Sequence, residues 1–189
     1  MDRAEADRLC TLLLAGNRLK TTPRTGWVQR GIPRAESVAD HSHGVALAAL
    51  LLCDLVDGPV DRALVLTMAI LHDLPEAVTG DLSLGASRLL PPGAKAAGEA
   101  AAMAELGAGL PLFGGWRAAW ERFEAQDSIE AEIVRDADRI DLLSQALVYE
   151  RTVGTRELEE FWTFAPVSSF RLAASRALVE ALAARRPRP

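Results

Sequence analysis

Apolar residues recur at helical spacing along almost the whole chain, and the alternating pattern of a strand is absent. The spacing predicts helices over 3–19, 38–56, 61–78, 95–106, 128–151 and 167–184, and one more that carries the aromatic stripe of Trp116, Trp120 and Phe123. A chain of 189 residues suits one domain with a full hydrophobic core. We therefore expect a single all-α domain over 1–189, a bundle of about six or seven helices with a frayed tail at 185–189.

Composition narrows the class of protein. Apolar residues make up 49% of the chain and charged residues 25%, and the net charge of −5 argues against a nucleic-acid polymer as partner. Cys10 and Cys53 give neither a disulfide framework nor a cysteine zinc motif. We find no signal peptide and no stretch that looks long and apolar enough for a membrane, so we expect a cytoplasmic protein.

The stretch "ILHDLPEAVTGD", 70–81, places ionisable residues in one of the most apolar segments. His72 and Glu76 continue the stripe of Val65 and Ala69, and burying such groups is costly unless they pair or bind something. Pro75 removes a backbone hydrogen bond and is expected to kink or loosen the last turn. A metal site, a salt-bridge network and a misjudged surface helix are the alternatives.

Two other predicted helices carry similar residues. His41 continues an apolar stripe with Val45, and Asp138 shares a face with Val134. Together with His72 and Asp73, they offer two imidazoles and two carboxylates, which suit one divalent metal such as Mn, Co, Fe, Ni or Zn. A helical bundle gathers its metal ligands from facing helices, so their separation in sequence is no objection. The alternative for each histidine alone is a satisfied core residue.

Four further polar residues receive other predictions. We expect His43 on the surface or behind the ligands, Asp40 at the cap of its helix, and Asp136 and Asp141 outside the ligand set.

The ordered set "H…HD…D" resembles the HD superfamily of metal-dependent phosphohydrolases, and within it the 5′-deoxynucleotidase family. The resemblance spans about 18–151 and includes "LKTTPRTGWVQRGIPRAESVADHS", "HDLPEAVTGD", the K-x3-E-x3-M spacing of Lys95, Glu99 and Met103, and "WERFEAQDSIEAEIVRDADRIDLLSQALVYE". The chain departs from the family at "GDLSLGAS", where a Pro and an acidic residue are missing, so substrate preference could differ.

The resemblance implies a function and a site. The metal ligands would be His41, His72, Asp73 and Asp138, and the catalytic acids would be Glu76 and Asp81. Members of the family hydrolyse deoxyribonucleoside 5′-monophosphates, use Co, Mn or Mg, and are commonly homodimers. Arg24 is the first candidate for holding the phosphate, with Lys20 weaker, and Trp27 would contact sugar or base or else belong to the core.

Other functions remain open from the sequence. The chain has only three histidines, which disfavours the HD oxygenases and the binuclear cyclic-dinucleotide phosphodiesterases. Ala77 after Glu76 disfavours a guanosine tetraphosphate hydrolase. A phosphatase for a modified or biosynthetic nucleotide, a sensor that binds metal or nucleotide without turnover, and a purely structural helical protein are the remaining alternatives.

Overall fold

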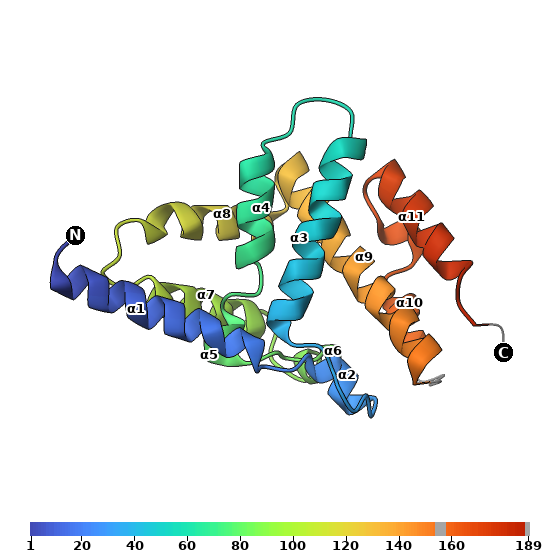
Figure 1. Cartoon of the computed structure of the whole chain (residues 1–189), viewed down its shortest axis with the longest axis horizontal. Coiled ribbons are helices and arrows are strands. Elements are labelled where there is room, and N and C mark those ends of the chain that lie inside the picture. The colour runs from blue at the N-terminus through green and yellow to red at the C-terminus, as the bar shows by residue number, and fades with distance from the viewer. Residues whose placement is uncertain (154–157, 188–189) are drawn as a thin grey trace. The chain divides into compact units, whose positions relative to one another are not determined.

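The computed structural model describes residues 1–153 and 158–187, and these form an all-α protein, as predicted (Figure 1). Within the described residues, extended backbone pairs at one place, an antiparallel bridge between Pro23 and Ser37. Seven of the described α-helices have ten or more residues: α1 (Arg3–Asn17), α3 (Val38–Leu55), α4 (Arg62–Leu71), α7 (Ala94–Leu106), α8 (Phe113–Ala125), α9 (Ile129–Thr152) and α11 (Ala173–Ala183).

Short helices make up the rest of the described secondary structure. They are α2 (Thr25–Gln29), α5 (Glu76–Thr79), α6 (Leu84–Ser87), α10 (Glu159–Phe164) and the 3₁₀ turns η1 (Arg18–Lys20) and η2 (Val167–Ser169). None of these was predicted as a separate element, because a helix of one turn carries too few residues to show a period.

The chain forms two compact units and passes through each of them twice. Unit 1 comprises Met1–Asp40 and Ile70–Glu121, and unit 2 comprises His41–Ala69 and Arg122–Pro189. The single domain over 1–189 stays a prediction.

Unit 1 is built around the contacts of α5 with α1 and with α7 (Figure 1). Asp2 caps α1, and its side chain accepts a hydrogen bond from the Glu5 amide. The buried apolar residues of this unit come from both of its chain segments: Leu12, Leu19, Val38, Leu71, Leu74, Ala77, Met103, Leu110, Phe113 and Trp120.

Unit 2 has α9 as its longest helix, with α10 and α11 packed against it (Figure 1). The carboxylate of Asp136 on α9 is fully buried and accepts hydrogen bonds from the amides of Arg171 and Leu172, just before α11 begins. This contact satisfies amides that a helix start leaves unpaired, so Asp136 has a structural role.

The C-terminal segment of unit 2 differs from the predicted frayed tail. Arg186 bonds both carboxylate oxygens of Glu150, at 2.8 and 3.1 Å, and lies over the Trp162 ring at 4.6 Å from its centroid. The last helix also begins later than predicted, at Ala173, after the 3₁₀ turn η2. Residues 188–189 lie outside the described part of the chain.

The predicted helix over 61–78 is wrong in its second half. The α-helix α4 ends at Leu71, and α5 begins at Glu76. His72 and Asp73 therefore lie in a turn, which Pro75 explains, since proline cannot continue the hydrogen bonds of the preceding helix. Gly80 then ends α5 with a φ of 72°, a conformation that glycine adopts without strain.

The start of α3 is capped by two residues of unit 1. The hydroxyl of Ser37 accepts a hydrogen bond from the Asp40 amide, and the Asp40 carboxylate accepts one from the Ser37 amide. This is the reciprocal arrangement of a capping box, and it confirms the prediction that Asp40 helps to cap this helix.

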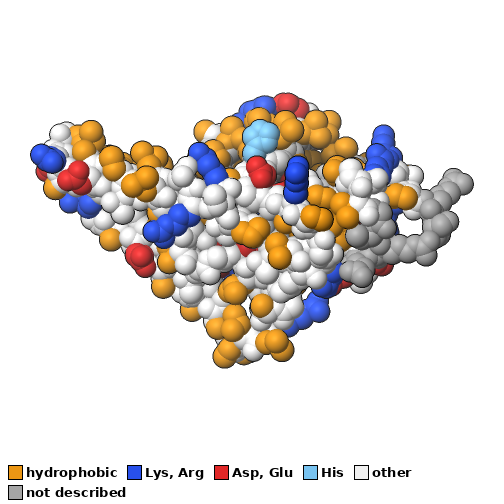
Figure 2. All heavy atoms as spheres, turned by 60° about the horizontal axis from the view of Figure 1, so that its bottom comes forward, with side chains coloured by type: hydrophobic (Ala, Val, Ile, Leu, Met, Phe, Trp, Pro, Cys, Tyr) orange, Lys and Arg blue, Asp and Glu red, His pale blue; other side chains and the backbone are white. Residues whose placement is uncertain are grey.

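The apolar helix α3 and the distribution of basic side chains bear on the predictions about a membrane and a nucleic-acid polymer. By length and composition alone, α3 would be long and apolar enough to cross a membrane, contrary to our reading of the sequence, although a core helix passes the same test. On the face drawn in Figure 2, Lys and Arg side chains are separated by uncharged and hydrophobic ones.

Candidate active site

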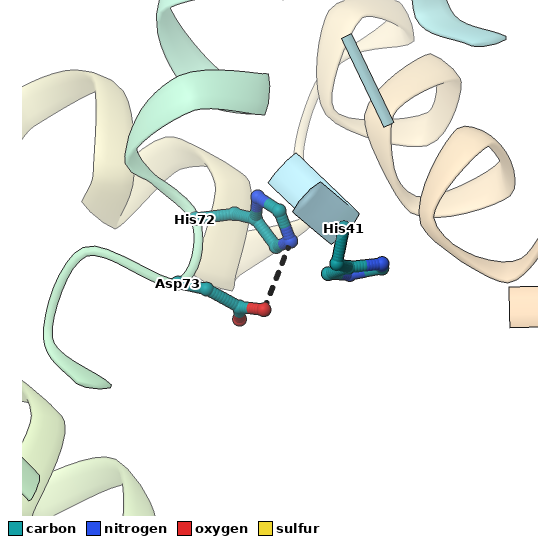
Figure 3. Close-up of side chains that lie close together, drawn as sticks. All are labelled: His41, His72 and Asp73. Atoms are coloured by element: carbon teal, nitrogen blue, oxygen red, sulfur yellow. Dashed lines mark ion pairs between the residues drawn. The ribbon is translucent and has the colours of Figure 1, made fainter. Parts of the chain in front are cut away.

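In unit 1, the turn after α4 brings an imidazole and a carboxylate together. Nε2 of His72 lies 3.3 Å from Oδ2 of Asp73, the ion pair drawn with a dashed line in Figure 3. Nη1 of Arg24 approaches the same oxygen at 3.1 Å. The indole of Trp120 donates to the carbonyl of His72 at 3.3 Å, so the core of unit 1 holds this turn in place.

In unit 2, the ring of His41 lies between two carboxylates of α9. Nδ1 is 2.7 Å from Oδ2 of Asp141, and Nε2 is 3.1 Å from Oδ1 of Asp138. His41 is fully buried on α3, the helix from which its side chain extends in Figure 3. Gly44 allows the close approach, because a Cβ there would lie 1.9 Å from an oxygen of Asp141.

The hydrogen bonding of His41 tests whether these residues fit a metal. If Nδ1 donates its proton to Asp141, the neutral ring presents only a lone pair at Nε2. A lone pair and the Asp138 carboxylate cannot face each other at 3.1 Å unless a proton or a cation lies between them. The carboxylate behind Nδ1 is the usual partner of a metal-binding histidine.

Both imidazole–carboxylate distances also fit a shared ion. Two ligand atoms, each about 2.1 Å from one ion, lie roughly 3.0–3.4 Å apart in octahedral or tetrahedral geometry. The 3.3 Å of His72 and Asp73 and the 3.1 Å of His41 and Asp138 fall in this range. Each pair, one nitrogen and one oxygen, therefore has a spacing that suits a divalent metal.

Glu76 at the start of α5 is a buried acid. Glu76 is 3% exposed, and its Oε2 has no hydrogen-bond partner among the residues that the structure describes. Burial, together with the charges of Asp73 and Asp81, raises the pKa of Glu76 to about 9, against the smaller opposing effects of Arg24 and Lys95. At neutral pH the carboxyl of Glu76 is therefore protonated and able to donate a proton.

Asp81 has a different environment from that of Glu76. Its Oδ2 accepts a hydrogen bond from the Thr25 amide, and its carbonyl accepts one from the Thr25 hydroxyl at 2.7 Å. These bonds hold the start of α2, and thereby the adjacent Arg24, beside the turn that carries His72 and Asp73.

The other predicted substrate residues lie in the same basic segment. Trp27 is 1% exposed, and its indole donates to Glu36 at 2.8 Å, which favours the core role that the sequence left open. Lys20 is exposed at the end of η1. Contact of either residue with a substrate stays a prediction.

Two polar contacts were not foreseen. The sequence analysis placed Asp141 outside the ligand set and did not predict that it contacts His41, and it did not predict the hydrogen bond between Trp27 and Glu36. The spacing of Asp138 and Asp141, three residues apart on one helical face, was the available signal for the first.

Comparison with known proteins defines the class to which this fold and site belong. An HD-domain family model matches residues 16–169, so the chain belongs to the HD-domain family. The 5′-deoxynucleotidase HDDC2 of Danio rerio is 33% identical over 161 residues, which cover 82% of this chain and 77% of that protein. The 5′-deoxynucleotidase hdd1 of Schizosaccharomyces pombe is 30% identical and covers 85% and 82%.

Solved structures share this fold. A conserved hypothetical protein of Pyrococcus furiosus, 34% identical, superposes with a TM-score of 0.78 over 93% of this chain and 98% of that one. A predicted metal-dependent phosphohydrolase of Magnetospirillum magnetotacticum, 23% identical, shares the fold with a TM-score of 0.68 over 98% and 100%.

Proposed function

We propose that the protein is a metal-dependent phosphomonoesterase that hydrolyses nucleoside 5′-monophosphates, deoxyribo- or ribonucleotides, to nucleoside and phosphate. The 5′-deoxynucleotidase relatives support this substrate class. The observation that carries the proposal is the His41 ring, whose Nε2 faces Asp138 at 3.1 Å while its Nδ1 is bonded to Asp141. A buried acid, Glu76, then distinguishes a hydrolase from a protein that only binds metal.

The proposed metal ligands are His41, His72, Asp73 and Asp138. Both histidines are buried and Asp73 is half-buried, as expected for residues that bind an ion away from bulk water. The ion would be Co, Mn or Mg, with Fe, Ni and Zn as alternatives. When bound, a divalent cation lowers the pKa of water and offsets the negative charge of the phosphate.

The side chains of unit 1 supply the proton and hold the substrate. The bond between phosphorus and the 5′-oxygen breaks as water adds to phosphorus, and the departing alkoxide needs a proton. Glu76 carries one at neutral pH and is our candidate for the acid. Asp81 holds the loop of Arg24, so that this guanidinium can meet a phosphate oxygen.

A modified or biosynthetic nucleotide is the second candidate substrate. The departure "GDLSLGAS" ends in α6, which is capped by the buried Ser83, two residues after Asp81. Leu84 and Leu89 are exposed there, and they offer an apolar surface that a larger leaving group could use. A homodimer and a cytoplasmic location complete the proposal and follow from the family resemblance and the sequence.

The test is release of phosphate from a panel of deoxy- and ribonucleoside 5′-monophosphates with Co, Mn, Mg or no metal. We expect metal-dependent release that His72→Ala abolishes. His43→Ala is the matched control, since His43 is an exposed histidine and should leave the rate unchanged. Phosphate release that persists in His72→Ala would contradict the proposal, and metal binding without release from any substrate would favour a sensor.

A further inference from the structure

Helix α7 carries two charged residues on the side that faces the turn of His72 and Asp73 in unit 1. Lys95, Glu99 and Met103 are spaced four residues apart, so they lie along one side of the helix. Met103 is fully buried in the same core as Leu74, which lies in the turn after α4, and Ala77, which lies in α5. The face that carries Lys95 and Glu99 therefore continues toward Asp73 and Glu76.

Lys95 and Glu99 form an ion pair that differs from a surface pair. Nζ of Lys95 lies 3.2 Å from Oε1 of Glu99, whose side chain is only 14% exposed while that of Lys95 is 41% exposed. A pair with the same spacing on α8, Arg117 and Glu121, is 49% and 53% exposed. Glu99 therefore contacts the ammonium of Lys95 from the buried side, and the rest of the ammonium stays accessible to solvent.

Carboxyl groups predominate around this pair, so an anion that binds here needs the positive charge of Lys95. Burial raises the pKa of Glu99, which Lys95 opposes, and the charge of Asp73 raises it further. Lys95 also acts on Glu76 and Asp73, so one ammonium faces several carboxyl groups. A phosphate dianion could not approach such a group of carboxyls without cations beside it, and Arg24 is already paired with Asp73.

We propose that Lys95 is a substrate-binding residue that contacts the phosphate group, and that Glu99 is the positioning residue that directs its ammonium. An ammonium has three donors, so Lys95 can keep its bond to Glu99 and still donate to a phosphate oxygen. The inference rests on the proposed function for its substrate. Its chemistry is the recognition of a phosphate group, whatever the base or sugar.

The experiment measures the binding of inorganic phosphate to the metal-loaded protein by isothermal titration, together with KM and kcat for the best 5′-monophosphate. We expect Lys95→Met to weaken phosphate binding and raise KM by about tenfold or more, alike for all bases. Lys95→Arg should restore most of the affinity, and Glu99→Gln should raise KM several-fold. Arg117→Met, which removes the exposed pair on α8, is the matched control and should change neither quantity.

The outcomes separate this inference from the proposed function. Unchanged phosphate affinity in a folded Lys95→Met protein would overturn the role of Lys95, even if turnover is metal-dependent as proposed. Weakened phosphate binding in a protein that hydrolyses no monophosphate would support Lys95 and contradict the nucleotidase. If Lys95→Met does not fold, Glu99→Gln decides, because wild-type phosphate affinity and KM in a folded Glu99→Gln protein would contradict a directed ammonium.

Discussion

The ring of His41 lies between two carboxylates of α9, and each carboxylate contacts a different ring nitrogen. The Asp141 carboxylate accepts a hydrogen bond from Nδ1–H, which leaves the lone pair of Nε2 to face Asp138. The sequence predicted His41 and Asp138 as ligands because both continue apolar stripes. It could not assign Asp141, because residues three apart share a helical face and only the approach of α3 to α9 shows which one meets the ring.

Removal of the Asp141 carboxylate should weaken metal binding without unfolding the protein. Asp141→Asn can still contact Nδ1 but no longer fixes the tautomer by charge, so we expect a loss of roughly 10–100-fold in metal affinity. Titration of Mn or Co into the chelator-treated protein measures it. Asp54→Asn, at an exposed acid of unit 2 paired with Arg62, should keep the wild-type affinity. Equal affinities in the two variants would contradict this role.

Glu76 should make stability depend on pH in a defined direction. Its pKa is about 9 in the folded protein and near 4.5 in the unfolded chain, so the folded state binds the extra proton between these values. The resulting stability is complete below pH 4.5 and is lost as the pH rises toward 9, by at most about 1.4 kcal/mol per pH unit.

Urea unfolding at pH 6 and pH 8, with chelator present, tests this direction. The wild type should lose stability between the two values, and Glu76→Gln should remove that part of the loss. Glu105→Gln, at an exposed position of α7, should retain the wild-type difference. Equal pH dependence of stability in the wild type and in Glu76→Gln would show that Glu76 does not bind the extra proton in the folded state.

At the scale of elements, the sequence predicted long helices well and their interruptions poorly. The prediction of 128–151 corresponds to α9, Ile129–Thr152, because its start has a serine cap and its period is long. The prediction of 61–78 merged α4, the turn of His72 and Asp73, and α5, since Pro75 was expected to kink a helix rather than to separate two. That turn nevertheless carries the residues that the sequence singled out.

The close approach of α3 to α9 at Gly44 can be tested by substitution. A Cβ there would lie 1.9 Å from Oδ1 and 2.6 Å from Cγ of Asp141, so Gly44→Ala must displace that side chain or the helix. We expect a loss of about 1–3 kcal/mol in the free energy of unfolding, together with weaker metal binding. Urea unfolding and metal titration measure the two effects.

Gly98→Ala provides the comparison for Gly44→Ala. A Cβ at Gly98 on α7 meets nothing within 4 Å, so alanine there should stabilise the helix by about 0.5–1 kcal/mol. If Gly44→Ala had the same stabilising effect, α3 and α9 would not be in close contact at this point.

At the scale of the whole molecule, the chain passes from one unit to the other within helices. It does so between Asp40 and His41 in α3, between Ala69 and Ile70 in α4, and between Glu121 and Arg122 in α8. His41 adjoins the first of these positions and His72 follows the second by two residues. The sequence showed no linker that would reveal two units, since no such linker exists where continuous helices connect them.

The proposed ligands come from both units, and this gives the last prediction. Metal that binds only the folded protein should stabilise it by about 2.7 kcal/mol at a free concentration 100 times Kd, which raises Tm by roughly 5–10 °C for a chain of this size. His72→Ala removes a ligand from unit 1 and Asp138→Asn one from unit 2, so both variants should lose the shift, while His43→Ala retains it. Thermal unfolding with and without Mn or Co measures all four proteins. A shift lost in only one of the two ligand variants would mean that the ion binds within one unit, and the four-residue ligand set would then be wrong.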